Sequence, residues 1–74
     1  APLAGGLLEA AFGLTPSEAA VAAELAEGVR REEIASRRGV SLATVHSQLK
    51  SIFGKAGVSR EVELILSIAR LGRL

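Results

Sequence analysis

The sequence predicts an all-α domain of four helices, and three observations support this fold class. The 74 residues are enough for one small domain with a modest core. Hydrophobic residues make up 49% of the chain and only two residues are aromatic, so aliphatic side chains must form a core that suits closely packed helices. The apolar residues also recur at spacings of three and four, which is the period of one helix face.

Several classes of protein are excluded by what the chain lacks. It contains no cysteine, so disulfides, thiolate metal sites and cysteine nucleophiles are excluded, and a reducing, cytoplasmic location is expected. No stretch approaches the roughly 18 consecutive apolar residues that cross a bilayer. The start of the chain also lacks the basic region of a signal peptide, so we expect no membrane association.

The chain is expected to be a fragment, because it contains no methionine and its first residue is not a natural start. Residues 1–13 are expected to be a linker or an N-terminal extension from a missing upstream domain. The folded domain is expected over residues 14–74.

A first helix is predicted from about Pro16 to Glu27. Thr15 and Glu18 supply the two halves of a capping box, and proline is accepted at the first helical position because no amide donor is needed there. Gly28 is suited to the left-handed residue after the last turn.

A second, short helix is predicted over residues 31–38, with acidic residues in its first turn and basic residues in its last turn, as the helix dipole favours. Gly39 ends this helix, and Ser41 is suited to cap the next one. The turn between the two helices therefore has only three residues, 39–41.

A third helix is predicted from Leu42 to about Ala56. Apolar residues at helical spacing form one face, namely Leu42, Val45, Leu49, Ile52, Phe53 and Ala56. Small or polar residues form the opposite face, namely Ala43, His46, Ser47, Lys50 and Gly54. That face has no glutamate, although glutamate is a good helix former and is common elsewhere in the chain.

Ser59 is suited to cap a fourth helix from Arg60 to about Leu71. The apolar residues of this helix cover more than the ~100° stripe of an ordinary amphipathic helix. Two interpretations stay open: the surplus apolar surface packs against residues 3–12 of the same chain, or it forms a homodimer contact. The residues expected at such a dimer interface are Leu64, Ile65, Ile68 and Leu71.

Charge is distributed unevenly, although the formal net charge is only +1. Residues 1–29 contain four glutamates and no lysine or arginine, whereas residues 34–60 contain five basic residues and no acid. A segment of this kind suits contact with a polyanion, although a chance loss of acids from a short chain would look the same.

A short helix, a tight turn with a glycine and a longer helix with a small, polar outer face together describe a helix-turn-helix unit. The second helix of such a unit fits the major groove of DNA, where a carboxylate would be costly beside the phosphates. We therefore expect double-stranded DNA to be the partner of this domain.

Six short motifs occur in order along the chain: Leu14-Thr15-Pro16-x-Glu18, Leu25-Ala26-x-Gly28, Glu33-Ile34-Ala35, Gly39-Val40-Ser41, Thr44-Val45 and Lys50-Ser51-Ile52-Phe53-x-Lys55-x-Gly57-Val58. Over residues 14 to about 71, the chain resembles the LuxR/GerE-type helix-turn-helix domain of bacterial transcription regulators. The resemblance implies a third helix that reads DNA and a fourth helix that forms a homodimer. It also implies an upstream sensory or receiver domain, and RNA polymerase is a further candidate partner.

The resemblance assigns roles to individual residues. The base-contact candidates are His46, Ser47, Lys50 and Ala43. The phosphate-contact candidates are Arg30, Arg31, Thr44, Ser51 and Lys55. Arg38 is interpreted only as a complement of the helix dipole. The chain departs from the family pattern at Arg30, where a Ser or Thr cap is usual, and at Gln48, where His is common.

Other functions fit these patterns less well. A protein-interaction module would use the same fold and its apolar last helix without useful affinity for DNA. A sigma-factor promoter-binding domain shares the first half of the motif pattern. An enzyme is not expected, because the chain shows no paired carboxylates, no nucleophile beside a base and no phosphate-binding loop. We predict no metal, cofactor or small-molecule ligand.

Overall fold

The computed structural model describes residues 5–72, and within that range it contains helices and no strands. The helices are α1 (Gly5–Phe12), α2 (Pro16–Ala26), α3 (Arg31–Arg38), α4 (Leu42–Ala56) and α5 (Glu61–Leu71). The all-α fold class is confirmed. Among the described residues, no helix is both long enough and apolar enough to cross a membrane.

The capping box at the start of α2 forms as the sequence predicts. The Thr15 hydroxyl accepts a hydrogen bond from the Glu18 amide at 3.1 Å, and a Glu18 carboxylate oxygen accepts one from the Thr15 amide at 3.0 Å. Two amides that a helix start would leave unpaired are thereby satisfied.

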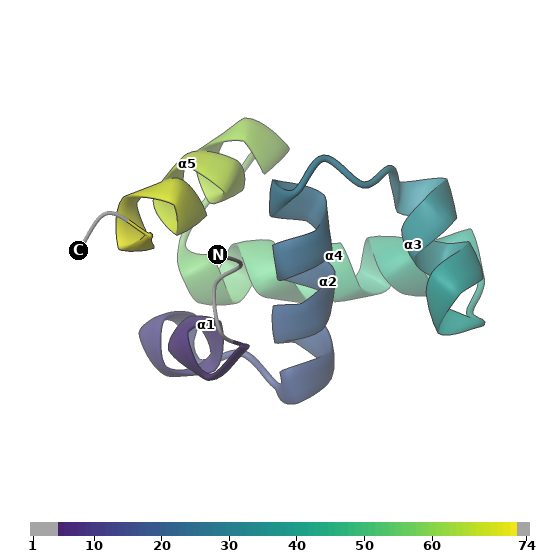
Figure 1. The fold of residues 1–74 in the computed structure, drawn as a ribbon, viewed down its shortest axis with the longest axis horizontal. Coiled ribbons are helices and arrows are strands. Elements are labelled where there is room, and N and C mark those ends of the chain that lie inside the picture. Colours follow the sequence, from purple (N-terminus) through teal and green to yellow (C-terminus); the bar gives the residue numbers. More distant parts are fainter. Residues whose placement is uncertain (1–4, 73–74) are drawn as a thin grey trace.

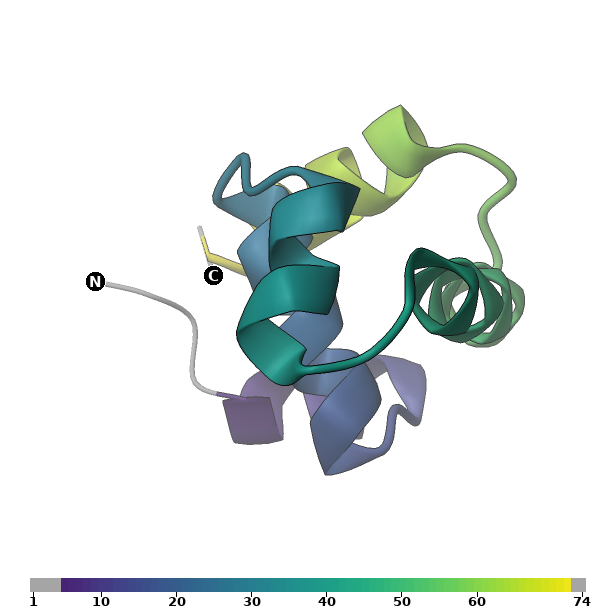
Figure 2. The ribbon, with the colours of Figure 1, turned by 90° about the vertical axis from the view of Figure 1, so that its right-hand side faces the viewer.

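The turn between α3 and α4 also follows its sequence signals. Gly39 adopts a left-handed conformation with φ +67°, which glycine accepts without a steric penalty. The Ser41 hydroxyl then accepts a hydrogen bond from the Thr44 amide at 3.1 Å and so caps α4. The turn swings the chain from the end of α3 to the start of α4, which gives the helix-turn-helix arrangement (Figure 2).

The start of α5 differs slightly from the prediction. The helix begins at Glu61 and its N-cap is Arg60, so Ser59 is not the cap. The Glu63 carboxylate accepts hydrogen bonds from the amides of Ser59 and Arg60, at 3.1 and 3.0 Å. The Glu63 side chain, in the first turn of α5, therefore satisfies the two backbone amides that immediately precede the helix.

The core forms around α2, which contacts each of the other four helices (Figure 1). Its fully buried large side chains are all aliphatic, as the composition predicts, and they are Leu8, Ile34, Leu49, Ile52, Leu64, Val21 and Val45. Phe12 and Phe53 are only partly buried and lie at the margin of this cluster.

Helix α1 is an element beyond the four helices that the sequence predicts. It lies within residues 1–13, for which a linker or extension was expected, and it packs on α2 with Leu8 fully buried. The segment carries no acidic residue in its first turn and no basic residue in its last turn. Burial against α2 therefore stabilises α1 where local end signals are weak. One interpretation expected residues 3–12 to cover the last helix. The first two residues of that segment lie within residues 1–4, which are outside the described residues.

Candidate nucleic-acid interface

The outer face of α4 is exposed over its length. Val45, Leu49 and Ile52 point into the core, while the four base-contact candidates, Ala43, His46, Ser47 and Lys50, are all exposed. Figure 2 looks along α4 and shows it at one edge of the domain, with no other helix over its outer side. The helical period alone thus separates a buried face from a face that a large ligand can reach.

The polar groups on this outer face are not engaged within the described part of the chain. Within residues 5–72, the side chains of His46, Ser47 and Lys50 form no hydrogen bond or ion pair. No acidic residue occurs between Leu42 and Arg60. The face therefore carries donors and one ammonium group and no carboxylate of its own, and the nearest acid is Glu18 of α2, which lines a shallow depression beside Ala43 and Ser47.

Three of the phosphate-contact candidates on α4 have partners inside the domain. The Thr44 hydroxyl lies 3.0 Å from the Ser41 hydroxyl. The Ser51 hydroxyl donates to Glu18 at 2.6 Å, and the Lys55 ammonium donates to the other oxygen of Glu18 at 2.7 Å. Ser51 and Lys55 are therefore hydrogen-bonded to α2 in the free domain.

Glu18 is the buried group to which these contacts converge. Its side chain is only 10% exposed, and hydrogen bonds from Lys55, Ser51 and the Thr15 amide lower its pKa from 4.5 to about 2. Ser51 and Lys55 are one turn apart on α4, so they lie on the same side of the helix. The single carboxylate of Glu18 therefore binds this side of α4 to α2. The sequence predicts the capping role of Glu18 but not its role as a link between α2 and α4.

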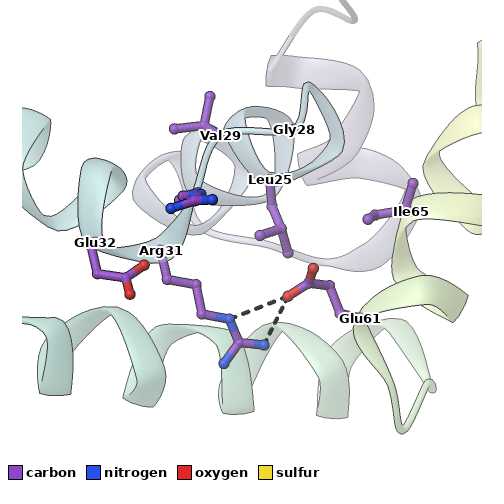
Figure 3. A pocket seen from close by; sticks show the side chains of 8 residues that line it. Leu25, Gly28, Val29, Arg31, Glu32, Glu61 and Ile65 are labelled. Carbon is purple, nitrogen blue, oxygen red and sulfur yellow. Dashed lines mark hydrogen bonds and ion pairs between the residues drawn. The ribbon is translucent and has the colours of Figure 1, made fainter.

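The remaining phosphate-contact candidates lie at the start of α3. The Arg31 guanidinium donates from Nε and Nη2 to one oxygen of Glu61, at 3.2 and 2.9 Å. This pair spans a pocket between the end of α2, the start of α3 and the start of α5 (Figure 3). Arg30 is exposed and, within residues 5–72, forms no ion pair. Of the two cations, Arg30 is therefore the more available for contact with a phosphate.

The dimer-interface candidates on α5 divide into two groups. Leu64 is 0% exposed and Ile68 is 3% exposed, so both belong to the core of this chain and cannot meet a second copy. The most exposed apolar side chains on α5 are Val62, at 58%, and Leu66, at 53%. Ile65 and Leu71 are half-buried. The helical pattern overstated the dimer set, because part of the apolar circumference of α5 faces α2 and α4.

Comparison with known proteins decides the family. The GerE model, which describes the luxR family of bacterial regulatory proteins, matches residues 13–68. The chain belongs to the luxR family. The resemblance drawn from the six motifs is thereby confirmed, and the match begins after the end of α1, which is the helix that the motifs did not predict.

Two relatives illustrate the kind of protein that the chain matches. The chain is 45% identical over 51 residues to the transcriptional regulatory protein UhpA of Escherichia coli, a match that covers 69% of this chain and 26% of UhpA. It is 37% identical over 59 residues to the putative HTH-type transcriptional regulator Mb0914c of Mycobacterium bovis, covering 80% of this chain and 7% of that protein. The chain therefore spans about a quarter or less of the relatives it matches. No solved structure gives a significant match.

Proposed function

We propose that this luxR-family domain binds double-stranded DNA as the output domain of a transcription regulator, with α4 in the major groove. The observation that carries the proposal is the outer face of α4, which is exposed, free of acids and composed of small or donor side chains. The regulators UhpA and Mb0914c, whose names describe transcriptional regulation, support the same function. The proposal assigns no catalytic step to the domain.

The groove contacts follow from the chemistry of the exposed side chains. Lys50 donates to the acceptors of guanine or to a phosphate, and Ser47 and His46 donate or accept at base edges. Ala43 presents a methyl group, which suits apolar contact with thymine. These four residues form one continuous face because they lie on one side of α4.

The backbone contacts are assigned chiefly to Arg30 and Thr44, which are both exposed. Arg31, Ser51 and Lys55 each have a carboxylate partner in the free domain, so they reach a phosphate only by sharing or exchanging that partner. Few phosphate contacts per copy means weak binding by one domain, with an affinity that falls as salt rises.

Two copies on adjacent half-sites would bind more tightly than one. We propose that the exposed side chains of Val62 and Leu66 on α5 form the contact between copies, with Ile65 and Leu71 at its margin. A dimer of helix-turn-helix domains places its reading helices about 34 Å apart, one turn of DNA. In a longer parent protein, an upstream sensory or receiver domain would control this pairing, and RNA polymerase would be a further partner.

The same apolar patch favours a second candidate function, a protein-interaction module without useful DNA affinity. Binding to a duplex of random sequence at low salt separates the two functions. We expect salt-dependent binding by the wild type, which Lys50→Gln weakens several-fold. Arg37→Gln is the matched control, since it removes the same charge from α3, where Arg37 is paired with Glu33 at 2.6 Å. An absence of salt-dependent binding by the wild type would favour the interaction module.

Self-association is tested separately with Leu66→Glu. This change places a charge in the proposed contact between copies, so it should abolish dimer formation on DNA while leaving the binding of one copy intact. Sedimentation of the complex reports the number of copies. A dimer that persists in Leu66→Glu would exclude this part of α5 as the interface.

A further inference from the structure

Three helices meet at the hydroxyl of Ser17, the second residue of α2. Arg38, the last residue of α3, donates from Nη2 to Ser17 Oγ at 3.2 Å, and Gln48 on α4 donates from Nε2 to the same oxygen at 3.1 Å. Because the Ser17 oxygen accepts both bonds, its own hydrogen is available for an acceptor outside the domain. Ser17 is exposed to solvent, so such an acceptor can reach it.

The cluster of Ser17, Arg38 and Gln48 borders the outer face of α4. A shallow depression extends along this side of α4, and its lining includes Ala43 and Ser47 from the outer face as well as Gln48 from the cluster. Glu18 also lines it, and the charge of that carboxylate is paired with Lys55 at 2.7 Å. When a recognition helix lies in the major groove, the sugar-phosphate backbones run along its two flanks. The cluster therefore lies on the flank where one of these backbones would pass.

The positive charge on Arg38 is only partly neutralised by carboxylates within the domain. Its nearest carboxylate, on Glu24, is 3.6 Å away, and Glu24 also lies 3.8 Å from Arg37, so two cations share one anion. A guanidinium carries five N–H donors, and the Arg38 side chain is still 27% exposed. Arg38 thus retains both charge and donors for an oxygen-rich anion.

We propose that Arg38 and Ser17 form a contact site for a phosphate of the DNA backbone, with Gln48 holding the Ser17 hydroxyl in place. This inference rests on the proposed function, because it names an additional contact made while α4 occupies the groove. It changes the role of Arg38, which the sequence alone indicates only as a complement of the helix dipole. It also adds the start of α2 to a surface otherwise assigned to α3 and α4.

The test compares Arg38→Gln with Arg37→Gln for binding to a duplex of random sequence over a range of salt concentrations. Both variants lose one positive charge from the same end of α3, so long-range attraction to DNA falls equally. Only the loss of a close phosphate contact should weaken the salt dependence, by roughly 0.9 in the slope of log affinity against log salt. We expect Arg38→Gln to bind roughly five- to tenfold more weakly at low salt than Arg37→Gln.

A second variant, Ser17→Ala, removes the hydroxyl donor without changing charge. It should weaken binding roughly two- to threefold and leave the salt slope unchanged, because no charge is lost. Thermal unfolding of each variant confirms that the binding measurements are made on folded protein.

The outcomes separate this inference from the proposed function. If the wild type does not bind the duplex, the proposed function fails. If the wild type binds but Arg38→Gln and Arg37→Gln share the same affinity and slope, DNA binding stands and the phosphate site is overturned. A Ser17→Ala variant that binds as tightly as the wild type would equally remove Ser17 from the site.

Discussion

The carboxylate of Glu18 on α2 lies 2.7 Å from the ammonium of Lys55 on α4, across 37 residues of sequence. The same carboxylate accepts a hydrogen bond from Ser51 and completes the capping box of α2. One buried charge therefore satisfies a helix end and also holds α4 against the core.

Replacing Glu18 with glutamine should destabilise the domain by about 2 kcal/mol, because the charge-assisted bonds are lost and Lys55 keeps no anionic partner. For a domain of this size, that corresponds to a fall in Tm of roughly 8 to 16 °C. Thermal unfolding followed by circular dichroism measures the change. Glu27→Gln is the control, since Glu27 is exposed and should alter stability by less than about 0.5 kcal/mol.

The contribution of Glu18 should depend on pH. Its pKa is lowered from 4.5 to about 2 in the folded state, so the carboxylate stabilises the fold above about pH 5. That stabilisation, about 3 kcal/mol at pH 7, should be mostly lost as the pH falls toward 2. The difference in free energy of unfolding between wild type and Glu18→Gln should therefore shrink between pH 7 and pH 2.5. A constant difference would contradict the assignment.

Leucines two residues apart on α5 should respond differently to alanine. Leu64→Ala removes a fully buried side chain and should cost about 2 to 5 kcal/mol. Leu66→Ala removes an exposed one and should change the stability of the isolated domain by less than about 0.5 kcal/mol. Chemical denaturation reports both values. Similar losses at the two positions would mean that α5 is rotated from the orientation described.

Helix α1 should be part of the folded domain rather than a free extension. Leu8→Ala is therefore expected to destabilise the protein by about 2 kcal/mol or more, because Leu8 is buried against α2. Leu7, its neighbour, is exposed, so Leu7→Ala serves as the control. If the two variants unfold at the same temperature as the wild type, α1 does not contribute to the core.

Replacing Gly39, just before α4, and Gly54, inside α4, with alanine should change the stability of the domain in opposite directions. Gly39 has φ +67°, so Gly39→Ala should destabilise the turn by about 1 kcal/mol or more. Gly54 lies inside α4 without a positive φ, and a Cβ there would meet no atom within 4 Å. Gly54→Ala should therefore stabilise the domain by about 0.5 to 1 kcal/mol. The Tm values of the two variants test this contrast.

Local signals in the sequence predicted α3 and α4 with their observed bounds. Both helices are bounded by residues whose conformational preferences act within one turn, such as Gly39 and Ser41. The outer face of α4 was predictable as well, because a regular period assigns Val45 inward and Lys50 outward once the helix is known.

The sequence therefore determined, by itself, the class of fold, the helix-turn-helix unit and the exposed face of α4. Tertiary structure alone decided that α1 is helical, that Leu64 lies in the core and that Lys55 and Arg31 are paired with Glu18 and Glu61. The physical reason is range: caps and helical period act between residues a few positions apart, whereas these pairs join residues 37 and 30 positions apart. Such partners meet only after the helices have packed, and no local pattern records which faces will touch.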